Sequence, residues 1–362
     1  MNIGIDGNEA NIDKRVGVGQ FAYNILLELS KAKSNNTYYV FLKNQPLADM
    51  PPVSKNWRYI VFGPQKLWTK IALPFYLYFL SPKLDLFYSP SHYSPHFSPF
   101  PTIPTIHDLG YLNTKQQFTK KDFYQLTQWT EHSIKQAQKI IAVSEFTKNE
   151  IVRIYQVDPG KISVVFNGIG QVPKFDDNTL QKFKITKPYF LYLGTLKPNK
   201  NIPFLITEFS KFIKQHLQHQ LVIAGKKGWL YDEIFNVVKQ EKIETSVIFT
   251  DFITESEKYC LYHNALATVL PSLYEGFGIP AIEAQQSGSP LIVSHIPAYD
   301  EIIDPQSALI IDPIKNNDIT NAMVKIQDSK LRQELIKQGK INSAKYTWSN
   351  SVHSLLKAFD TI

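Results

Sequence analysis

The chain has 362 residues, of which 43% are hydrophobic and 20% charged, which is typical of a globular protein with two domains and excludes a disordered or fibrous one. The single cysteine, Cys260, excludes an internal disulfide and a thiolate metal cluster. The longest apolar run, residues 71–80, is too short to span a bilayer, and the chain starts with a strand pattern instead of a basic secretory leader. We therefore expect a cytoplasmic protein.

The net charge of +7 is concentrated in the first half of the chain. Residues 1–170 contain 18 Lys and Arg against 12 Asp and Glu, whereas the remaining residues contain 21 against 20. Residues 50–84 contain five basic and eight aromatic side chains but no acidic one. This mixture suits peripheral contact with an anionic surface at the inner membrane face. The alternative is a core helix over residues 66–80 whose lysine heads reach water. No motif predicts a nucleic-acid partner.

Short apolar runs alternate with helical patterns along the whole chain. The runs are residues 2–5, 38–42, 59–62, 86–89, 103–106, 140–143 and 162–166, followed by 189–193, 221–224, 247–250, 267–270, 291–293 and 308–311. Many of them end in, or are followed directly by, Gly, Ser, His or Asp, as are parallel strands whose carboxyl ends carry ligand loops. Two such series predict an α/β protein with two doubly wound, Rossmann-like domains.

The boundary between the two domains is predicted from a loss of periodicity. Residues 167–170 (NGIG) form a turn signal, and an aperiodic stretch follows. We therefore expect an N-terminal domain over residues 1–170 and a C-terminal domain over residues 171–349. A last helical pattern begins near Ser349 and covers residues 350–362.

Glycines open the first helix of the chain. Residues 17–22 match G-x-G-x-x-A, with Gly17 and Gly19 before a helix expected from Gln20 to Ser30. A nicotinamide-binding fingerprint requires its first glycine directly after the first strand, and here ten residues intervene after Asp6. The hydride-transfer interpretation therefore fails. Glycines at a helix N-terminus still allow backbone amides to approach a phosphate.

His107 follows the apolar run at residues 103–106 and precedes Asp108. The carboxyl end of a parallel strand places this histidine well for function. Asp108 has two interpretations from the sequence, either orienting the imidazole ring or capping the next element.

Two cation-bearing loops follow strands of the second series. Residues 194–201 (GTLKPNKN) bring Lys197 and Lys200 after a glycine, which suits a diphosphate clamp. Gly225 begins a similar loop, residues 225–230.

Residues 271–284 (PSLYEGFGIPAIEA) are the most informative stretch of the chain. An apolar run precedes them, glycines occupy the connection, and Pro280 marks the first turn of a helix. Glu275 and Glu283 are separated by seven residues. Carboxylates repel phosphate but accept hydrogen bonds from hydroxyls, so the arrangement suits a diphosphate flanked by two polyols, as in a nucleotide-diphospho-sugar.

This stretch resembles the signature of retaining glycosyltransferases of family 4, which have the GT-B fold of two Rossmann-like domains facing a cleft. Residues 221–230 (LVIAGKKGWL) resemble a subset whose members are often mannosyltransferases. The resemblance implies a hexosyltransferase, with GDP-mannose as the expected donor. The implied acceptor is a glycan or a lipid-linked molecule in cell-surface polysaccharide synthesis. The resemblance also implies that the last helix crosses back onto the first domain.

Matching the family motifs residue by residue implies the site. The donor-binding residues would be Gly17, Gly19, Thr195, Lys200, Gly225, Glu275, Gly276, Phe277, Gly278, Ile279 and Glu283, and the catalytic residues His107, Glu275 and Lys200. By the same matching, Glu283 binds the ribose and Glu275 the sugar. Thr195 stands where the family often has an arginine, so Lys197 is a candidate for the second cation.

We expect no cofactor and no metal, because no Asp-x-Asp motif ends a strand and the His and Cys residues lack metal-ligand spacing. Several alternatives remain open from the sequence. These are a donor such as UDP-glucose, an epimerase or phosphorylase acting on sugar phosphates with the same fold, and a saccharide-binding protein without catalysis.

Overall fold

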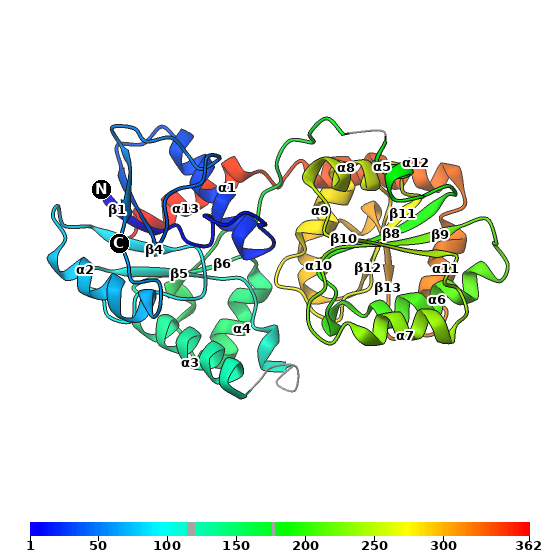
Figure 1. Ribbon diagram of the computed structural model, residues 1–362, viewed down its shortest axis with the longest axis horizontal. Helices are drawn as coiled ribbons and strands as arrows, with labels where there is room; N and C mark the ends of the chain where they lie inside the picture. The colour runs from blue at the N-terminus through cyan, green and yellow to red at the C-terminus, as the bar shows by residue number, and fades with distance from the viewer. Residues whose placement is uncertain (114–119, 176–177) are drawn as a thin grey trace. The chain divides into compact units, whose positions relative to one another are not determined.

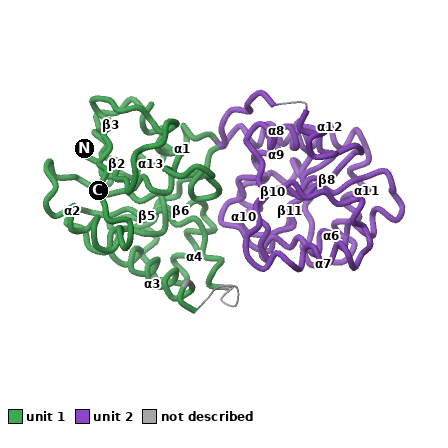
Figure 2. The backbone as a smooth tube through the Cα atoms, viewed as in Figure 1, with its two compact units in different colours: residues 1–168, 347–362 green, residues 169–346 purple. Residues whose placement is uncertain are grey.

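The computed structural model describes residues 1–113, 120–175 and 178–362. The chain forms two compact units (Figure 2). Unit 1 contains residues 1–168 and 347–362, and unit 2 contains residues 169–346. The sequence placed these boundaries after residue 170 and after residue 349.

Unit 1 is built on a parallel sheet of seven strands in the order β3-β2-β1-β4-β5-β6-β7. The strands are β1 (Asn2–Asp6), β2 (Thr37–Leu42), β3 (Trp57–Val61), β4 (Leu86–Ser89), β5 (Thr102–Ile106), β6 (Ile140–Ala142) and β7 (Ile162–Val164). The central strands β4, β5 and β6 are buried along their whole length, as expected for a parallel sheet covered on both faces.

The helices of unit 1 are α1 (Val18–Lys31), η1 (Trp68–Ala72), α2 (Leu73–Phe79), η2 (Gly110–Asn113), α3 (Lys120–Gln136), α4 (Glu145–Tyr155), η4 (Pro159–Lys161) and α13 (Trp348–Phe359). Helix α1 buries Phe21, Ile25 and Leu29 at helical spacing, so its apolar stripe faces the core.

Unit 2 contains a parallel sheet of six strands in the order β10-β9-β8-β11-β12-β13. Its strands are β8 (Tyr189–Leu193), β9 (Gln220–Ala224), β10 (Val247–Asp251), β11 (Ala267–Leu270), β12 (Leu291–Ser294) and β13 (Leu309–Ile311). Its helices are α5 (Thr179–Lys182), η5 (Pro198–Lys200), α6 (Ile202–Ile213), α7 (Asp232–Gln240), α8 (Glu255–Asn264), α9 (Ile279–Gln286), α10 (Pro297–Ile302), η6 (Pro305–Ser307), α11 (Asp318–Lys325) and α12 (Ser329–Ser343). Figure 1 shows α8 and α12 on one side of this sheet and α6 and α7 on the other. The predicted architecture of two Rossmann-like sheets is confirmed, and each predicted apolar run contains or overlaps a strand.

The chain returns to unit 1 at its C-terminus. The hydroxyl of Thr347 caps α13 by accepting a hydrogen bond from the amide of Asn350. A Cβ atom on Gly168 would lie 2.2 Å from the backbone nitrogen of Trp348, so the two connecting segments meet where only a glycine fits. At the far end of the helix, the Phe359 ring packs 5.4 Å from the ring of Tyr88 on β4.

The segment over residues 66–80 differs from the single core helix considered from the sequence. It begins at Trp68 with a π-helical turn and continues as α2. Trp68, Leu73 and Leu77 are buried, but five large apolar side chains on or beside the two helices are exposed. These are Leu67, Ile71, Phe75, Tyr78 and Phe79. Core packing therefore accounts for one face only, because the apolar positions surround the helix.

Among the described residues, no helix combines the length and the apolar character needed to cross a membrane.

Phe359→Ala should destabilise unit 1. The ring is fully buried against Tyr88, and removing a buried phenylalanine side chain costs about 3–5 kcal/mol of unfolding free energy. Urea unfolding measures this loss, and Lys357→Ala on the exposed face of α13 is the control, with an expected change within about 0.5 kcal/mol. If Phe359→Ala lowered the unfolding free energy no more than the small change expected for Lys357→Ala, packing of α13 would not stabilise unit 1.

Candidate active site

The strand order of unit 2 defines where a ligand can bind. Successive strands run from β8 outward to β9 and β10, and the chain then returns to place β11 on the other side of β8. Ligands of open parallel sheets bind in the crevice at the carboxyl ends of the strands beside such a reversal. The loops that follow β8 and β11 are residues 194–201 and 271–278, which are the loops singled out from the sequence.

Lys200 and Glu275 are brought together by these two loops. The ammonium group of Lys200 forms an ion pair with Oε1 of Glu275, and both side chains are largely buried. Asn199 joins the loops further, because its side-chain amide donates to the carbonyl of Tyr274 at 3.1 Å and its own carbonyl accepts from the amide of Leu273 at 2.8 Å. The cation and the carboxylate expected from the sequence therefore form one ion pair.

Two hydroxyl groups hold the Glu275 carboxylate in place. Ser272 donates to Oε1 at 2.7 Å, and Tyr299 of α10 donates to the same oxygen at 3.4 Å. The sequence pattern did not predict the Tyr299 contact, because Tyr299 reaches Glu275 from another element. Burial, and then the Glu275 charge, raise the pKa of Tyr299 well above its ordinary value. The Tyr299 hydroxyl therefore remains a donor at physiological pH.

Position 278 requires a glycine, because of its backbone conformation and because of the space around it. It is the N-cap of α9 with φ 109°, in the region that favours glycine, and a Cβ atom there would lie 2.4 Å from Cε1 of Tyr299. In the same loop Gly276 and Phe277 are buried, and the Phe277 ring packs 5.8 Å from that of Tyr346. Ile279 is the first residue of α9. The Phe277 ring therefore belongs to the core, so any role in ligand binding falls to its backbone.

The loops after β8 and β9 approach each other through glycines. Gly225 has φ 141°, and a Cβ atom on it would lie 2.1 Å from the carbonyl oxygen of Gly194. A pair of amide hydrogen bonds continues the contact beyond the strands, from Leu196 to the carbonyl of Lys226 at 3.0 Å and from Gly228 to the carbonyl of Leu196 at 2.9 Å. The backbone packing of the two loops is therefore sufficient to explain why a glycine occupies position 225.

Thr195 and Lys197 lie in the loop after β8. Thr195 is partly exposed, and the ammonium group of Lys197 lies 5.3 Å from the centroid of the Trp229 ring. The aromatic ring holds the Lys197 cation near the loop that begins at Gly225. Lys197 therefore remains the candidate for the second cation.

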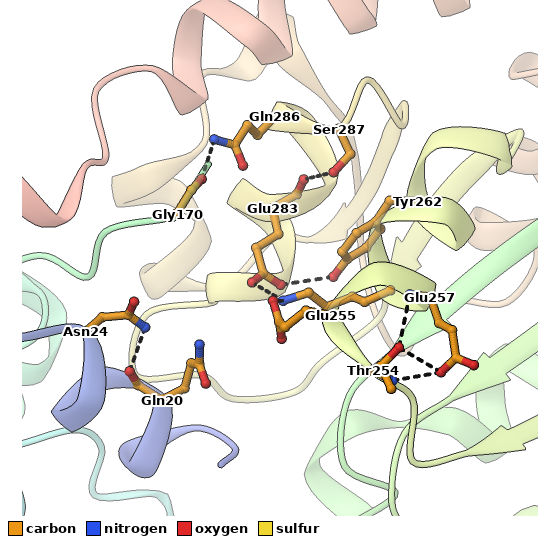
Figure 3. Close-up of polar contacts among 11 residues, drawn as sticks. Gln20, Asn24, Gly170, Thr254, Glu255, Glu257, Tyr262, Glu283, Gln286 and Ser287 are labelled. Atoms are coloured by element: carbon orange, nitrogen blue, oxygen red, sulfur yellow. Dashed lines mark hydrogen bonds and ion pairs between the residues drawn. The ribbon is translucent and has the colours of Figure 1, made fainter. Parts of the chain in front are cut away.

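Glu283 forms a second buried ion pair (Figure 3). Its carboxylate lies 2.6 Å from the ammonium group of Lys258 on α8, and the hydroxyl of Tyr262 donates to it at 3.4 Å. Glu255 also contacts Lys258, at 2.8 Å. A carboxylate accepts about four hydrogen bonds, so these two contacts leave capacity for a ligand. The Lys258 contact was missed because residues 258 and 283 are distant in the sequence and share no local pattern.

The two partners of this pair respond differently to burial. Burial raises the pKa of Glu283 above its ordinary value, and the nearby Lys258 only partly offsets this effect. For Lys258, burial alone lowers the pKa, but the Glu283 and Glu255 carboxylates outweigh burial and raise it. Lys258 therefore carries its charge at neutral pH and is what allows Glu283 to be ionised in a buried place.

His107 of unit 1 is enclosed by three neighbours. Its Nε2 lies 3.0 Å from the carbonyl oxygen of Pro90, and its ring packs edge-on against Phe21 of α1 at 4.8 Å. The ring of His92 lies parallel at 5.7 Å, and Nε2 of His92 accepts a hydrogen bond from the His107 amide. His92 did not stand out in the sequence because it lies in a loop without a motif.

Burial first, and then the neighbouring His92, lower the pKa of His107 to about 4. The imidazole is therefore neutral at physiological pH. Since the Pro90 carbonyl can only accept, we assign the ring proton to Nε2, which makes Nδ1 the acceptor atom. Asp108 accepts a hydrogen bond from the amide of Gly110 at 2.9 Å and caps η2, as in the second of its two interpretations.

Gly17 and Gly19 surround the start of α1. Gly17 is the N-cap with φ 49°, and a Cβ atom there would meet nothing within 4 Å. A Cβ atom on Gly19 would lie 3.0 Å from the carbonyl oxygen of Glu9. Gly17 is therefore open to an approaching ligand, while Gly19 is limited by its own backbone neighbours.

Comparisons with known proteins agree with this geometry. The family described as glycosyl transferases group 1 matches residues 176–342, and glycosyltransferase family 4 matches residues 16–170. The O-antigen chain mannosyltransferase B of Escherichia coli is 24% identical over 91% of this chain and 84% of its own. The O-antigen chain mannosyltransferase RfbU of Salmonella typhimurium is 31% identical over 58% of this chain and 56% of its own.

Solved structures show the same fold. Sucrose-phosphate synthase from Thermosynechococcus elongatus has a TM-score of 0.78 at 18% identity, covering 99% of this chain and 98% of that one. WaaG, a glycosyltransferase involved in lipopolysaccharide biosynthesis, has a TM-score of 0.72 at 15% identity, covering 99% and 98%. The two units therefore have the GT-B fold. The chain belongs to the family 4 glycosyltransferases and is an enzyme of that type.

Lys258→Met should leave the Glu283 carboxylate buried without its cation. Removing one partner of a buried pair costs about 3–5 kcal/mol of unfolding free energy at neutral pH. Because the pKa of Glu283 is higher in the folded protein than in the unfolded chain, the folded state binds more protons. Stability should then fall as the pH rises above 4.5, the ordinary value for a glutamate, and recover below it.

Urea unfolding of the Lys258→Met variant at several pH values measures this slope. The double variant Lys258→Met with Glu283→Gln is the matched control and should be stable without the slope. An equal loss at every pH would mean that Lys258 acts through packing alone.

Proposed function

We propose that this enzyme is a retaining, metal-independent hexosyltransferase. It would move a hexose, with mannose from GDP-mannose as the preferred donor, to a glycan or lipid-linked acceptor in cell-surface polysaccharide synthesis. The observation that carries the proposal is the Lys200–Glu275 pair beside the strand-order reversal of unit 2. The mannosyltransferases among the relatives favour mannose over other hexoses.

The donor roles follow from what each side chain can offer. Lys200 has three N–H donors, of which one contact is to Glu275, so others can reach the diphosphate. Glu275 and Glu283 accept from hydroxyls of the sugar and the ribose, respectively. The start of α9 and the glycine backbones supply amides and a helix dipole for the diphosphate charge. Because these groups neutralise the leaving group, the proposal requires no metal and no cofactor.

His107 is proposed to contact the hexose in the transition state. A neutral imidazole in a fixed orientation can hydrogen-bond a hydroxyl without adding charge. In the proposed front-face displacement, the bond from the anomeric carbon to phosphate breaks as the bond to the acceptor oxygen forms on the same face. The acceptor proton passes to an oxygen of the departing phosphate. Configuration is then retained without an enzyme nucleophile.

Release of free nucleotide tests the donor. GDP-mannose should be turned over faster than UDP-glucose, and Lys200→Met should lower the rate by at least about tenfold, since charge-assisted contacts contribute about 1.5–3 kcal/mol. Lys239→Met on the exposed face of α7 is the matched control and should leave the rate unchanged.

Activity should also survive EDTA. Loss of activity with EDTA and its rescue by Mg²⁺ or Mn²⁺ would contradict the metal-independent mechanism. Retained activity in Lys200→Met would remove Lys200 from the site, and faster release from UDP-glucose would replace the proposed donor.

The exposed apolar face of η1 and α2 supports a peripheral position at the inner, cytoplasmic membrane face. Phe75 and Phe79 are 68% and 75% exposed, and their rings lie 5.0 Å apart. The surrounding stretch of residues 50–84 carries five cations and no acid. Aromatic side chains entering the interface and cations attracted to anionic lipids would act together.

Vesicle flotation tests this position. The wild-type protein should bind anionic vesicles in a salt-sensitive manner and neutral vesicles poorly, because each cation contributes about 1 kcal/mol that salt screens. Phe75→Ser with Phe79→Ser should weaken binding by at least about tenfold, since two apolar side chains no longer leave water.

Tyr124→Ser is the matched control, because Tyr124 is an aromatic residue on α3 that is similarly exposed, at 67%. Wild-type protein that stays in solution with anionic vesicles would favour a soluble acceptor.

A further inference from the structure

Unit 1 contains a hollow that the donor chemistry does not use. It has a volume of about 250 Å³, including the part open to solvent, and it lies between η1, the loop after β4 and α3. Lys70, Ser94, His96, Trp129 and His132 are among its lining residues. Much of this space is open to solvent, so the hollow suits one small group and not a nucleotide.

Three basic groups converge on the hollow. The ammonium group of Lys70 lies 4.3 Å from the centroid of the Trp129 ring, and the rings of His96 and His132 stack at 4.0 Å. Nε2 of His132 lies 2.8 Å from the carbonyl oxygen of His96, which orients that ring. The lining residues, all within the described part of the chain, include no carboxylate. The hollow is therefore suited to a negatively charged group.

Ser94 gives independent evidence for a ligand. Its side chain is 7% exposed, its Oγ has no hydrogen-bond partner among the described residues, and it lines the hollow. The amide of Ser94 is satisfied by Oγ of Ser133 at 3.0 Å. Buried hydroxyl groups nearly always have a partner, so an unpartnered one beside three bases points to an acceptor atom that the free protein lacks.

We propose that this hollow binds a phosphate group of the acceptor substrate, through Lys70, His96, His132 and the hydroxyl of Ser94. The inference rests on the proposed function, since it names the chemistry of the acceptor. Phosphate oxygens accept hydrogen bonds from the ammonium group, the hydroxyl and the protonated imidazoles, and they balance the positive charge.

The surroundings of Lys70 favour a phosphate attached to a lipid. Lys70 lies on η1, next to Ile71 and one turn before Phe75 of the exposed apolar face. A phosphate at Lys70 places an attached alkyl chain near this face. A phosphate on a water-soluble glycan is the other source of the same chemistry, and the two are separated by experiment.

Binding of a phosphate in the hollow is coupled to protonation of the His96 imidazole. Burial, and then the charges of His132 and Lys70, lower the pKa of His96. Tyr93 of the same loop has its pKa raised to about 12 by burial, so it stays neutral, and Trp129 does not titrate. A bound phosphate opposes the repulsion that His96 experiences, so His96 should gain protons on binding. Affinity should therefore increase as the pH falls through the titration of His96.

Imidazole resonances of the full chain report on the hollow directly. On titration with inorganic pyrophosphate, the signals of His96 and His132 should shift, with an increased pKa for His96. Lys70→Gln should weaken this binding at least about tenfold, while Lys66→Gln, the matched lysine outside the hollow, should not. Ser94→Ala removes only an unpartnered hydroxyl, so it should fold normally and still bind more weakly.

The source of the phosphate decides which probe binds at the lowest concentration. Vesicles that contain a polyprenyl phosphate should shift the two signals at a lower concentration than phosphatidylglycerol vesicles or a soluble sugar phosphate do. Preference for the sugar phosphate would assign the hollow to a soluble acceptor. Unmoved His96 and His132 signals with every probe, or equal affinities in Lys70→Gln and Lys66→Gln, would overturn the proposal. GDP binding, measured separately by calorimetry, shows whether the donor site of the proposed function is at fault.

Discussion

Pairing of buried charge is the constraint on which the site of unit 2 depends. Glu275 lies against Lys200 and Glu283 against Lys258, and all four side chains are largely withdrawn from water. An isolated carboxylate in such a place would take up a proton, and it would then be a poorer acceptor for sugar hydroxyls. Each lysine holds its glutamate in place through an ion pair before any ligand arrives. The hydrogen bonds from Ser272 and Tyr299 complete this orientation for Glu275.

Local patterns in the sequence were sufficient to predict the framework. Buried parallel strands are short apolar runs, and glycines mark the connections, so the two sheets and the loops that carry Lys200 and Glu275 could be predicted. Gly278 was singled out as part of a motif, and its φ of 109° and the nearby Tyr299 ring supply the physical reason. In contrast, the Gly225 position follows from the backbone of Gly194 and needs no ligand to explain it.

The partners of the site residues could not be predicted, because they arise from tertiary contacts. Lys258 follows Glu255 at a spacing typical of an ordinary surface pair on a helix, yet it is buried and reaches Glu283 from another element. His92 was missed for the same reason, because it meets His107 only through the fold of the chain. The segment over residues 66–80 was ambiguous for a different reason. Its apolar side chains surround the helix, and the sequence does not show which of them the sheet covers.

The Lys200–Glu275 pair also bears on how a charged donor can bind without creating unpaired charge. In the free protein the ammonium and the carboxylate satisfy each other. In the proposed complex, a diphosphate supplies new acceptors for Lys200 while sugar hydroxyls supply new donors for Glu275. Each group would thus gain a ligand partner while the other still lies beside it, and neither would pass through a buried, unsatisfied state. A free nucleotide, which has no sugar, would offer acceptors to Lys200 but no hydroxyl donors to Glu275. It would therefore weaken the ion pair without replacing the partner of Glu275. Under the proposed function, the pair would therefore favour the intact nucleotide-sugar over the free nucleotide, which is the discrimination that a transferase needs to release its product.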